Sequence, residues 1–313
     1  MGAGVSNWEL ARAVSIEGQL GVVSGIALEV IMARRLQSGD EGGHVRRALA
    51  AFPDQAVATR ILGEYFRESM LDRALARLPR PHRIADPDTL IQETIAASFM
   101  EIFLAKEGHD LPVGVNLLTK IELPILASLY GAMLAGVDFV IMGAGIPREV
   151  PGILDRLSRH EDVSMALHVE GATATDDFRS YLSPRKVLGN LPGELRRPSF
   201  FPIVSSNVLA TTMVRKATGR VDGLVIESPV AGGHNAPPRG ELMLDANGEP
   251  VYGPKDEGVV ERIADLGVPF YLAGGWGRPE KVREALGLGA AGVQVGTVFA
   301  FCRESGLMRS LKE

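Results

Sequence analysis

The 313-residue sequence predicts an α/β protein built on a parallel sheet. Short runs rich in Val, Ile and Leu recur along the chain, and a helical pattern follows most of them. The runs are almost continuously apolar, which is typical of strands buried on both faces beneath covering helices. Regular alternation of strand and helix then indicates either a closed eight-stranded barrel or an open doubly wound sheet.

Seven strands are predicted, and each ends in small or polar residues. They are LGVVSG (20–25), VGVNLL (113–118), VDFVIMG (137–143), FPIVSSN (201–207), VDGLVIES (221–228), VPFYLAGG (268–275) and AGVQVGT (291–297). The chain opens at MGAGVSNWEL, which indicates a loop entering a helix. A barrel would therefore have its first strand missing or truncated, and we expect the sequence to be an internal part of a longer protein.

Helix-boundary residues separate these strands. PILASLYGAMLAG (124–136) starts with Pro and ends with Gly, which are typical first-turn and C-terminal residues. NVLATTMVRKATG (207–219) starts with Asn207 as the expected N-cap and also ends with Gly. RPEKVREALGLG (278–289) repeats this scheme.

Two regions interrupt the alternation. Residues 26–110 are mainly helical in pattern, and residues 161–199 hold one strand-like run, SMALHVEGA, before a polar loop. We expect a single barrel domain over residues 1–313 with these two insertions, the helical one after the second barrel strand. A small hairpin is predicted in ELMLDANGEPVYG, around its Asn-Gly pair. The helical insertion could form a dimer contact or a lid, so formation of a homo-oligomer stays an open alternative.

Composition excludes several classes of protein. A net charge of −5 gives no basic surplus for a nucleic-acid backbone. The single cysteine, Cys302, allows no internal disulfide or cysteine-based zinc site, and no metal-binding cluster emerges. No run approaches the ~18 apolar residues of a membrane-spanning helix. We expect a soluble cytoplasmic protein with neither nucleic-acid nor membrane partners.

Candidate ligand-binding residues follow from strand position, because ligands of parallel sheets bind at the carboxyl ends of the strands. The residues there are mostly glycines, small hydroxyl residues and amides, which suit a ligand held by backbone N–H groups. Two late loops, AGGWGRPEKV and VGTVFAF, place small residues between a strand and a helix start. In barrels, phosphate often binds at the loops after the seventh and eighth strands. The alternative is that these glycines only permit tight turns.

One histidine occupies this predicted edge. His234, in SPVAGGHNAPPRG (228–240), follows a predicted strand behind two glycines. An imidazole there could take a proton from carbon near neutral pH. The alternative is a loop histidine that hydrogen-bonds the backbone. His44 also follows Gly-Gly, but it is predicted to lie on the surface in the first turn of a helix.

The motifs together resemble a known family. MGAGVSNWELARAVS, VGVNLL, DGLVIESPVAGGHNA and PFYLAGGWGRPEKVREALGLGAAGVQVGT are similar to the nitronate monooxygenase (2-nitropropane dioxygenase-like) family. The flavin-dependent enoyl-acyl carrier protein reductases belong to the same superfamily. Known members are FMN-binding (β/α)8 TIM barrels, so the resemblance implies that fold and FMN as the cofactor.

The resemblance also implies roles for individual residues. His234 would be the catalytic base toward the nitroalkane carbon. The loop at Gly2, Ala3 and Gly4 would face the flavin ring. The other implied cofactor-binding positions are Asn116, Ser206 and Glu227, then Ala231, Gly232 and Gly233 beside the ring, and Gly274, Gly275, Gly296 and Thr297 around the phosphate.

The implied reaction is oxidation of a nitroalkane or nitronate with dioxygen. Two alternatives stay open, namely NAD(P)H-dependent reduction of an activated C=C bond and a flavin-binding module without turnover. The sequence departs from the family at Val230, where Glu is usual, at Ala236, where Gly is common, and at Ser206, where some members carry Lys. These positions surround the expected substrate site. The resemblance therefore supports the fold and the FMN cofactor more strongly than it supports the identity of the substrate.

Overall fold

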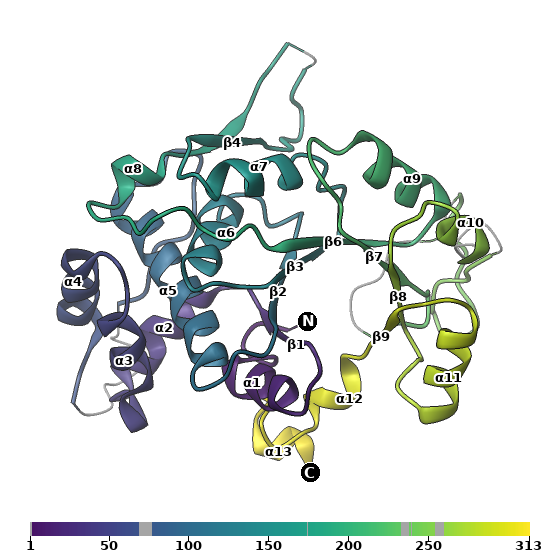
Figure 1. Ribbon diagram of the computed structural model, residues 1–313, viewed down its shortest axis with the longest axis horizontal. Helices are drawn as coiled ribbons and strands as arrows, with labels where there is room; N and C mark the ends of the chain where they lie inside the picture. The colour runs from purple at the N-terminus through teal and green to yellow at the C-terminus, as the bar shows by residue number, and fades with distance from the viewer. Residues whose placement is uncertain (1, 69–76, 174, 233–237, 239, 254–259) are drawn as a thin grey trace.

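The strands of the computed structural model form one parallel sheet with the order β1-β2-β3-β6-β7-β8-β9 (Figure 1). The structure describes residues 2–68, 77–173, 175–232, 238, 240–253 and 260–313. Within these ranges all seven predicted strands are confirmed: β1 (Gly21–Ser24), β2 (Val113–Leu118), β3 (Phe139–Gly143), β6 (Ser199–Val204), β7 (Leu224–Glu227), β8 (Phe270–Ala273) and β9 (Gly292–Gln294).

The sheet curls, and helices lie outside it (Figure 1). This α/β half-barrel confirms the predicted fold class. β1 and β9 are the two edges of the sheet, and no pairing joins them within the described ranges. The helices that accompany the barrel strands are α1 (Trp8–Ile16), α6 (Ile125–Leu134), α7 (Val150–Leu157), α9 (Asn207–Lys216), α10 (Val260–Ala264), α11 (Pro279–Gly287), α12 (Thr297–Ala300) and α13 (Arg309–Lys312).

Alternation along the strands separates two apolar cores. Outward-facing residues such as Val23 and Val115 join the large core beneath the helices. The second core is smaller and lies on the inner face of the curled sheet, with Ile141, Phe201, Val225 and Ala273 buried there and Val22 packed against them. Because side chains alternate between the faces of a strand, this division fixes which polar residues also face inward.

The first insertion is helical, as predicted. Its elements are α2 (Leu28–Gln37), a 3₁₀ turn (Glu41–Gly43), α3 (His44–Ala50), α4 (Gln55–Tyr65) and α5 (Asp88–Lys106). The carboxylate of Glu101 in α5, only 1% exposed, pairs with Arg35 at 2.6 Å and accepts the Trp8 backbone N–H at 2.8 Å. Since Trp8 is the first residue of α1, the insertion fixes the start of that helix. No helix in the described ranges is long and apolar enough to cross a lipid bilayer.

The second insertion contains the antiparallel pair β4 (Val163–Ala166) and β5 (Arg179–Leu182), and then α8 (Pro184–Val187). It projects from the top of the molecule in Figure 1. Hydrogen bonds join it to the first insertion: Gly189 N–H donates to Asp54 at 2.7 Å, Gln92 Nε2 donates to Val187 O at 2.7 Å, and Asn190 Nδ2 donates to Pro53 O at 3.0 Å. The two insertions therefore form one layer, although they lie far apart in the sequence.

The third irregular segment is the predicted hairpin. Leu244 and Pro250 form an antiparallel bridge, and the carboxylate of Asp245 accepts the N–H groups of Asn247 and Glu249 at 2.8 and 2.9 Å. These bonds close the turn around the Asn-Gly pair, and the turn prediction is confirmed.

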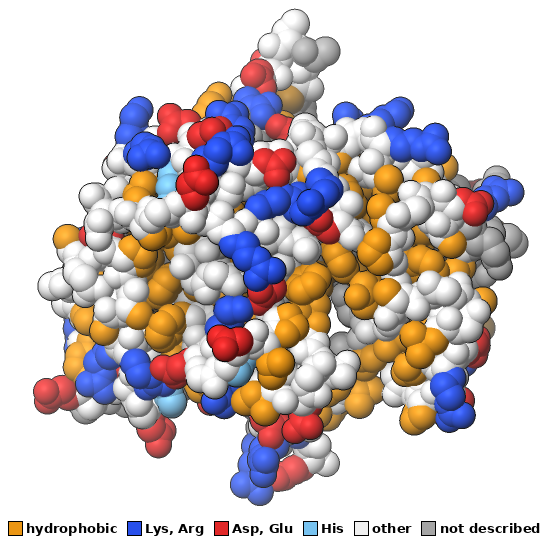
Figure 2. Space-filling view, in the orientation of Figure 1, with side chains coloured by type: hydrophobic (Ala, Val, Ile, Leu, Met, Phe, Trp, Pro, Cys, Tyr) orange, Lys and Arg blue, Asp and Glu red, His pale blue; other side chains and the backbone are white. Residues whose placement is uncertain are grey.

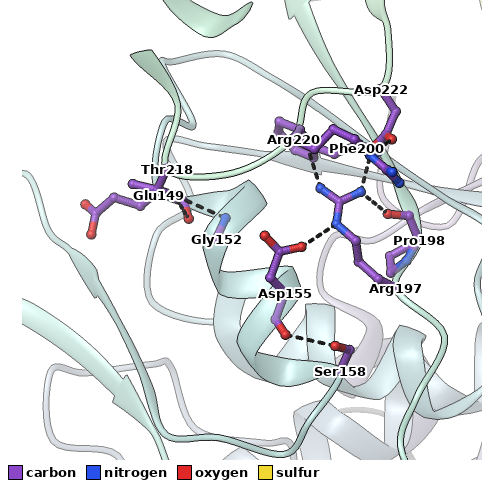
Figure 3. Close-up of polar contacts among 10 residues, drawn as sticks. All are labelled: Glu149, Gly152, Asp155, Ser158, Arg197, Pro198, Phe200, Thr218, Arg220 and Asp222. Carbon is purple, nitrogen blue, oxygen red and sulfur yellow. Dashed lines mark hydrogen bonds and ion pairs between the residues drawn. The ribbon is translucent and has the colours of Figure 1, made fainter. Parts of the chain in front are cut away.

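A network of charged residues joins the amino ends of β6 and β7 (Figure 3). The Arg197 guanidinium contacts Asp155 at 2.7 Å and Asp222 at 2.5 Å, and it also donates to the backbone oxygen of Arg220 at 2.6 Å. Asp222 in turn accepts the Phe200 N–H at 2.9 Å. Arg197 and Asp222 are 14% and 12% exposed. Such half-buried ion pairs are costly to break, because removing one member leaves the charge of the other less well compensated.

We expect Asp222→Ala to lower the free energy of unfolding by about 2–4 kcal/mol, because it leaves Arg197 short of a carboxylate and the Phe200 N–H without its acceptor. Arg196→Ala is the matched control, since its 78% exposed side chain also pairs with an aspartate, Asp138, at this end of the sheet. That control should cost about 0.5 kcal/mol or less. Urea unfolding monitored by circular dichroism measures both values. Equal unfolding midpoints for the two variants would contradict the assignment.

Candidate functional site

Polar side chains line the inner face of the sheet near the carboxyl ends of its strands. Ser24 pairs in register with Asn116, and Asn116 with Ile141 of the inner core. Glu227 pairs with Ala273, and Ala273 with Gln294. By strand alternation all four polar side chains face inward. Sequence reasoning singled out Asn116 and Glu227 but missed Ser24 and Gln294.

Loops after β7, β8 and β9 lie against one another. A Cβ on Gly274 would lie 3.0 Å from the Ala231 nitrogen, and one on Gly232 would collide with the Thr297 hydroxyl. A Cβ on Gly275 would lie 3.4 Å from the Val230 side chain. Gly274 and Gly275 have φ of +93° and +76°, a region that favours glycine. The structure thus brings together Ala231, Gly232, Gly274, Gly275 and Thr297.

Backbone donors point to an anion site in this cluster. The N–H groups of Gly275, Gly296 and Thr297 have no hydrogen-bond acceptor among the described residues. Gly296 and Thr297 begin α12 directly, as the sequence suggested, whereas α11 begins at Pro279, four residues beyond Gly275. The first of the two glycine loops is therefore a turn of its own and not the start of a helix.

The N-terminal loop lies at the opposite edge of the sheet. Ser24 N–H donates to Ser6 O at 2.8 Å, and Ser6 Oγ donates to Val22 O at 2.6 Å. On its other side, Gly306 N–H donates to Val5 O at 2.9 Å. Val5 and Ser6, which follow the Gly2–Gly4 loop, are therefore held between β1 and the C-terminal segment, and Gly4 lies against Gly306.

Ser206 has a structural role that the sequence did not indicate. Its hydroxyl accepts the Leu209 N–H at 3.2 Å and caps α9, with the residue 2% exposed. Asn207 was predicted to be this cap, and that prediction was wrong, since Asn207 is the first residue inside the helix. The Ser206 hydroxyl keeps its proton free to donate, so the predicted cofactor contact stays compatible with the cap.

Three buried polar atoms have no hydrogen-bond partner in the described part of the chain: Ser24 Oγ, Thr119 Oγ1 and Asn207 Oδ1. Ser24 ends β1, Thr119 follows β2, and Asn207 lies three residues beyond β6. All three lie at the carboxyl edge. Since a buried unpaired polar group costs about 1–3 kcal/mol, their common position indicates a polar ligand at this edge.

Glu227 is the acidic residue that ends β7. Burial raises the pKa of its carboxyl above the ordinary value. Burial therefore disfavours the ionised form relative to a carboxyl in water, and a carboxyl in its protonated form can both donate and accept a hydrogen bond.

Not every predicted residue can be placed. His234 and Gly233 lie outside the described residues, as does Ala236, and their predicted roles stay predictions. His44 is half-buried against Trp8, with ring centroids 5.0 Å apart, so its surface assignment was only partly right. No group of three or more His, Cys, Asp or Glu side chains within the described ranges is arranged to hold a metal ion.

The space-filling view shows a hollow near its centre, bordered by apolar side chains (Figure 2). In Figure 1 this region lies between the β1–β2 side and the β8–β9 side of the sheet. A curled parallel sheet with inward polar residues and glycine loops near the carboxyl ends of its strands defines the class, namely a barrel-type α/β protein whose candidate ligand site is the carboxyl edge.

Comparison with protein families agrees with the motifs. Residues 199–313 match the sequence profile of the family described as nitronate monooxygenase. The resemblance inferred from the motifs is confirmed over this part of the chain, which holds β6 to β9. No curated protein sequence matches the chain at a significant level.

Two solved structures are similar over the whole chain at low identity. A point variant of FabK from Thermotoga maritima has 18% identity and a TM-score of 0.49, with 100% of this chain and 65% of that chain covered. The enoyl reductase domain of MlnA from the macrolactin biosynthesis cluster of Bacillus amyloliquefaciens has 12% identity and a TM-score of 0.47, with 100% and 55% covered. The chain thus spans less than two thirds of the length of either structure.

We expect Glu227→Gln to change the pH dependence of stability. Because the pKa of Glu227 is raised in the folded protein, protonated Glu227 contributes to the free energy of unfolding below the ordinary pKa of about 4.3. This contribution is lost as the pH rises through the raised pKa. The variant should match the wild type at low pH and be more stable than it at about pH 8. Urea unfolding across pH measures this difference.

Glu161→Gln is a control with the opposite pH dependence of stability. A hydrogen bond from Arg159 lowers the pKa of Glu161, so the ionised carboxylate contributes to stability above the ordinary pKa. That contribution is lost as the pH falls through the lowered pKa. A Glu227→Gln variant less stable than the wild type at about pH 8 would show that the ionised carboxylate has a stabilising partner.

Proposed function

We propose that this chain is the FMN-binding barrel of a flavin-dependent oxidoreductase of the nitronate monooxygenase type. The observation that carries the proposal is the presence, at the carboxyl edge, of three buried polar atoms and of glycine-loop N–H groups that have no hydrogen-bond partner among the described residues. The family match over residues 199–313 supports the reaction class.

The residues present fit a phosphorylated flavin. Backbone N–H groups of Gly275, Gly296 and Thr297 would hold the phosphate, because they have no acceptor among the described residues. Gly274 and Gly275 are adjacent glycines with positive φ in the loop after β8. The cluster contains no side-chain carboxylate that would repel an anion. Asn116, Ser206 and Glu227 would contact the polar parts of the ring. Asn116 is only 6% exposed.

The chemistry divides between cofactor and protein. FMN, when bound, supplies an electron acceptor for the carbon substrate. His234 would take the proton from the carbon beside the nitro group, since an imidazole is basic near neutral pH. The inward apolar residues would exclude water from the ring, and the Gly2–Gly4 loop would approach it closely because its only side chain is the methyl group of Ala3. Dioxygen and a nitronate or nitroalkane are the proposed co-substrates.

A second candidate is NAD(P)H-dependent reduction of an activated C=C bond. Val230 favours it, because this apolar side chain is 73% exposed beside Gly275 at the position where the family usually has Glu. An apolar residue there offers a surface on which an uncharged substrate would pack.

The cofactor is tested first by titrating the purified chain with FMN and with riboflavin, following quenching of flavin fluorescence. FMN should bind about tenfold or more tightly than riboflavin, because only FMN places a phosphate on the free N–H groups. Failure of both flavins to bind would remove the oxidoreductase proposal.

Gly274→Ala should weaken FMN binding by about tenfold. The added Cβ would strain a φ of +93° and lie 3.0 Å from the Ala231 nitrogen, so the two loops would move apart. Gly287→Ala is the matched control, since no atom lies within 4 Å of its Cβ position in α11. Equal FMN affinity in both variants would show that the loop does not hold the phosphate.

The reaction is tested on the FMN-loaded chain without oxygen. Bleaching of the flavin absorbance by a nitronate alone supports the leading proposal, whereas rapid bleaching by NAD(P)H alone supports the second candidate. His234→Ala should slow bleaching by a neutral nitroalkane about 100-fold or more, with FMN affinity unchanged. An unaltered rate in this variant would contradict the assignment of His234 as base.

A further inference from the structure

We propose that the Ser24 hydroxyl binds the polar edge of the flavin ring, as a partner of Asn116. This inference rests on the proposed function and adds to it a residue that neither the sequence motifs nor the family match indicates. Ser24 is 1% exposed, and its hydroxyl has no hydrogen-bond partner within the described residues. A hydroxyl so deeply buried usually bonds to backbone, side chain or water.

The position of Ser24 directs its hydroxyl into the barrel. Val22, two residues earlier on β1, packs against the inner core, and Val23 between them is part of the outer core. Ser24 therefore shares the inner face with Val22. Its register partner Asn116 lies on the same face of β2. The two side chains thus lie on the same inner face at the carboxyl edge of the sheet, next to the apolar inner core.

Local structure does not need this hydroxyl. Ser24 N–H already donates to Ser6 O at 2.8 Å, which joins β1 to the N-terminal loop. The neighbouring hydroxyl of Ser6 behaves differently, since it donates to Val22 O at 2.6 Å. The Ser6 hydroxyl is therefore bonded within the protein, whereas the Ser24 hydroxyl has no partner among the described residues and is available to a ligand.

The kind of ligand atom follows from the surroundings. The phosphate-binding groups lie in the loops after β8 and β9, away from β1 in the sheet order. Ser24 is therefore assigned to the other end of the cofactor, the heterocycle, whose edge carries both hydrogen-bond donors and acceptors. A hydroxyl can serve either kind of atom, and the Asn116 amide beside it offers both as well.

Ser24→Ala tests the proposal by three measurements, two on FMN binding and one on the stability of the flavin-free chain. FMN affinity, from fluorescence quenching, should fall about 3- to 10-fold, the effect of losing one hydrogen bond. The visible absorption bands of bound FMN should shift as well. The unfolding midpoint of the flavin-free chain should stay the same or rise, because the variant removes a buried group that has no partner among the described residues. Ser24→Cys, which keeps the shape of the side chain but weakens the hydrogen bond, should lower FMN affinity as well.

Ser98→Ala is the matched control. Ser98 is 0% exposed in α5, and its hydroxyl donates to Ser128 O at 2.7 Å. Its loss should lower the unfolding midpoint and leave FMN affinity unchanged. Wild-type binding of FMN with unchanged affinity in both Ser24 variants would overturn this inference alone. Absence of FMN binding to the wild type would overturn the proposed function and this inference together.

Discussion

Parallel pairing of the strands is the constraint on which the rest of the structure depends. Each barrel strand pairs with the next one in the sheet, so all carboxyl ends lie at one edge. The same pairing sets which side chains face inward, and it places Ser24 beside Asn116 and Glu227 in line with Gln294. Residues from four separate parts of the sequence reach one site because of this register.

The two ends of the sheet differ in how their polar groups are satisfied. At the amino end, Asp138 accepts the Val113 N–H at 3.0 Å and pairs with Lys106 at 2.6 Å, and Asp222 makes the corresponding bonds with Phe200 and Arg197. These contacts hold neighbouring strands together. At the carboxyl end, three buried polar atoms and several backbone N–H groups have no partner among the described residues. The contacts at the amino end stabilise the sheet, and the carboxyl end is where we propose that the ligand binds.

Much of the fold could be predicted from the sequence, because strands buried on both faces are short, apolar and rich in β-branched residues. VGVNLL was predicted with its true bounds, and the helical insertion and the Asn-Gly turn were predicted correctly. The same apolarity concealed the site, since a strand that is apolar throughout does not show which face is inward. Ser24 was therefore missed although it ends a predicted strand. The cap at Ser206 was assigned one residue too late because Ser and Asn are about equally good caps. The predicted role of His234 depends on residues that the structure does not describe.

A crystal structure of the chain with FMN bound tests the central claim most directly. The phosphate oxygens should lie within hydrogen-bond distance, about 3 Å, of the backbone nitrogens of Gly275, Gly296 or Thr297. The edge of the ring should lie within the same distance of Ser24 Oγ and the Asn116 side chain. FMN bound with its phosphate at the β1–β2 side, or bound away from the carboxyl edge, would contradict the account of the site.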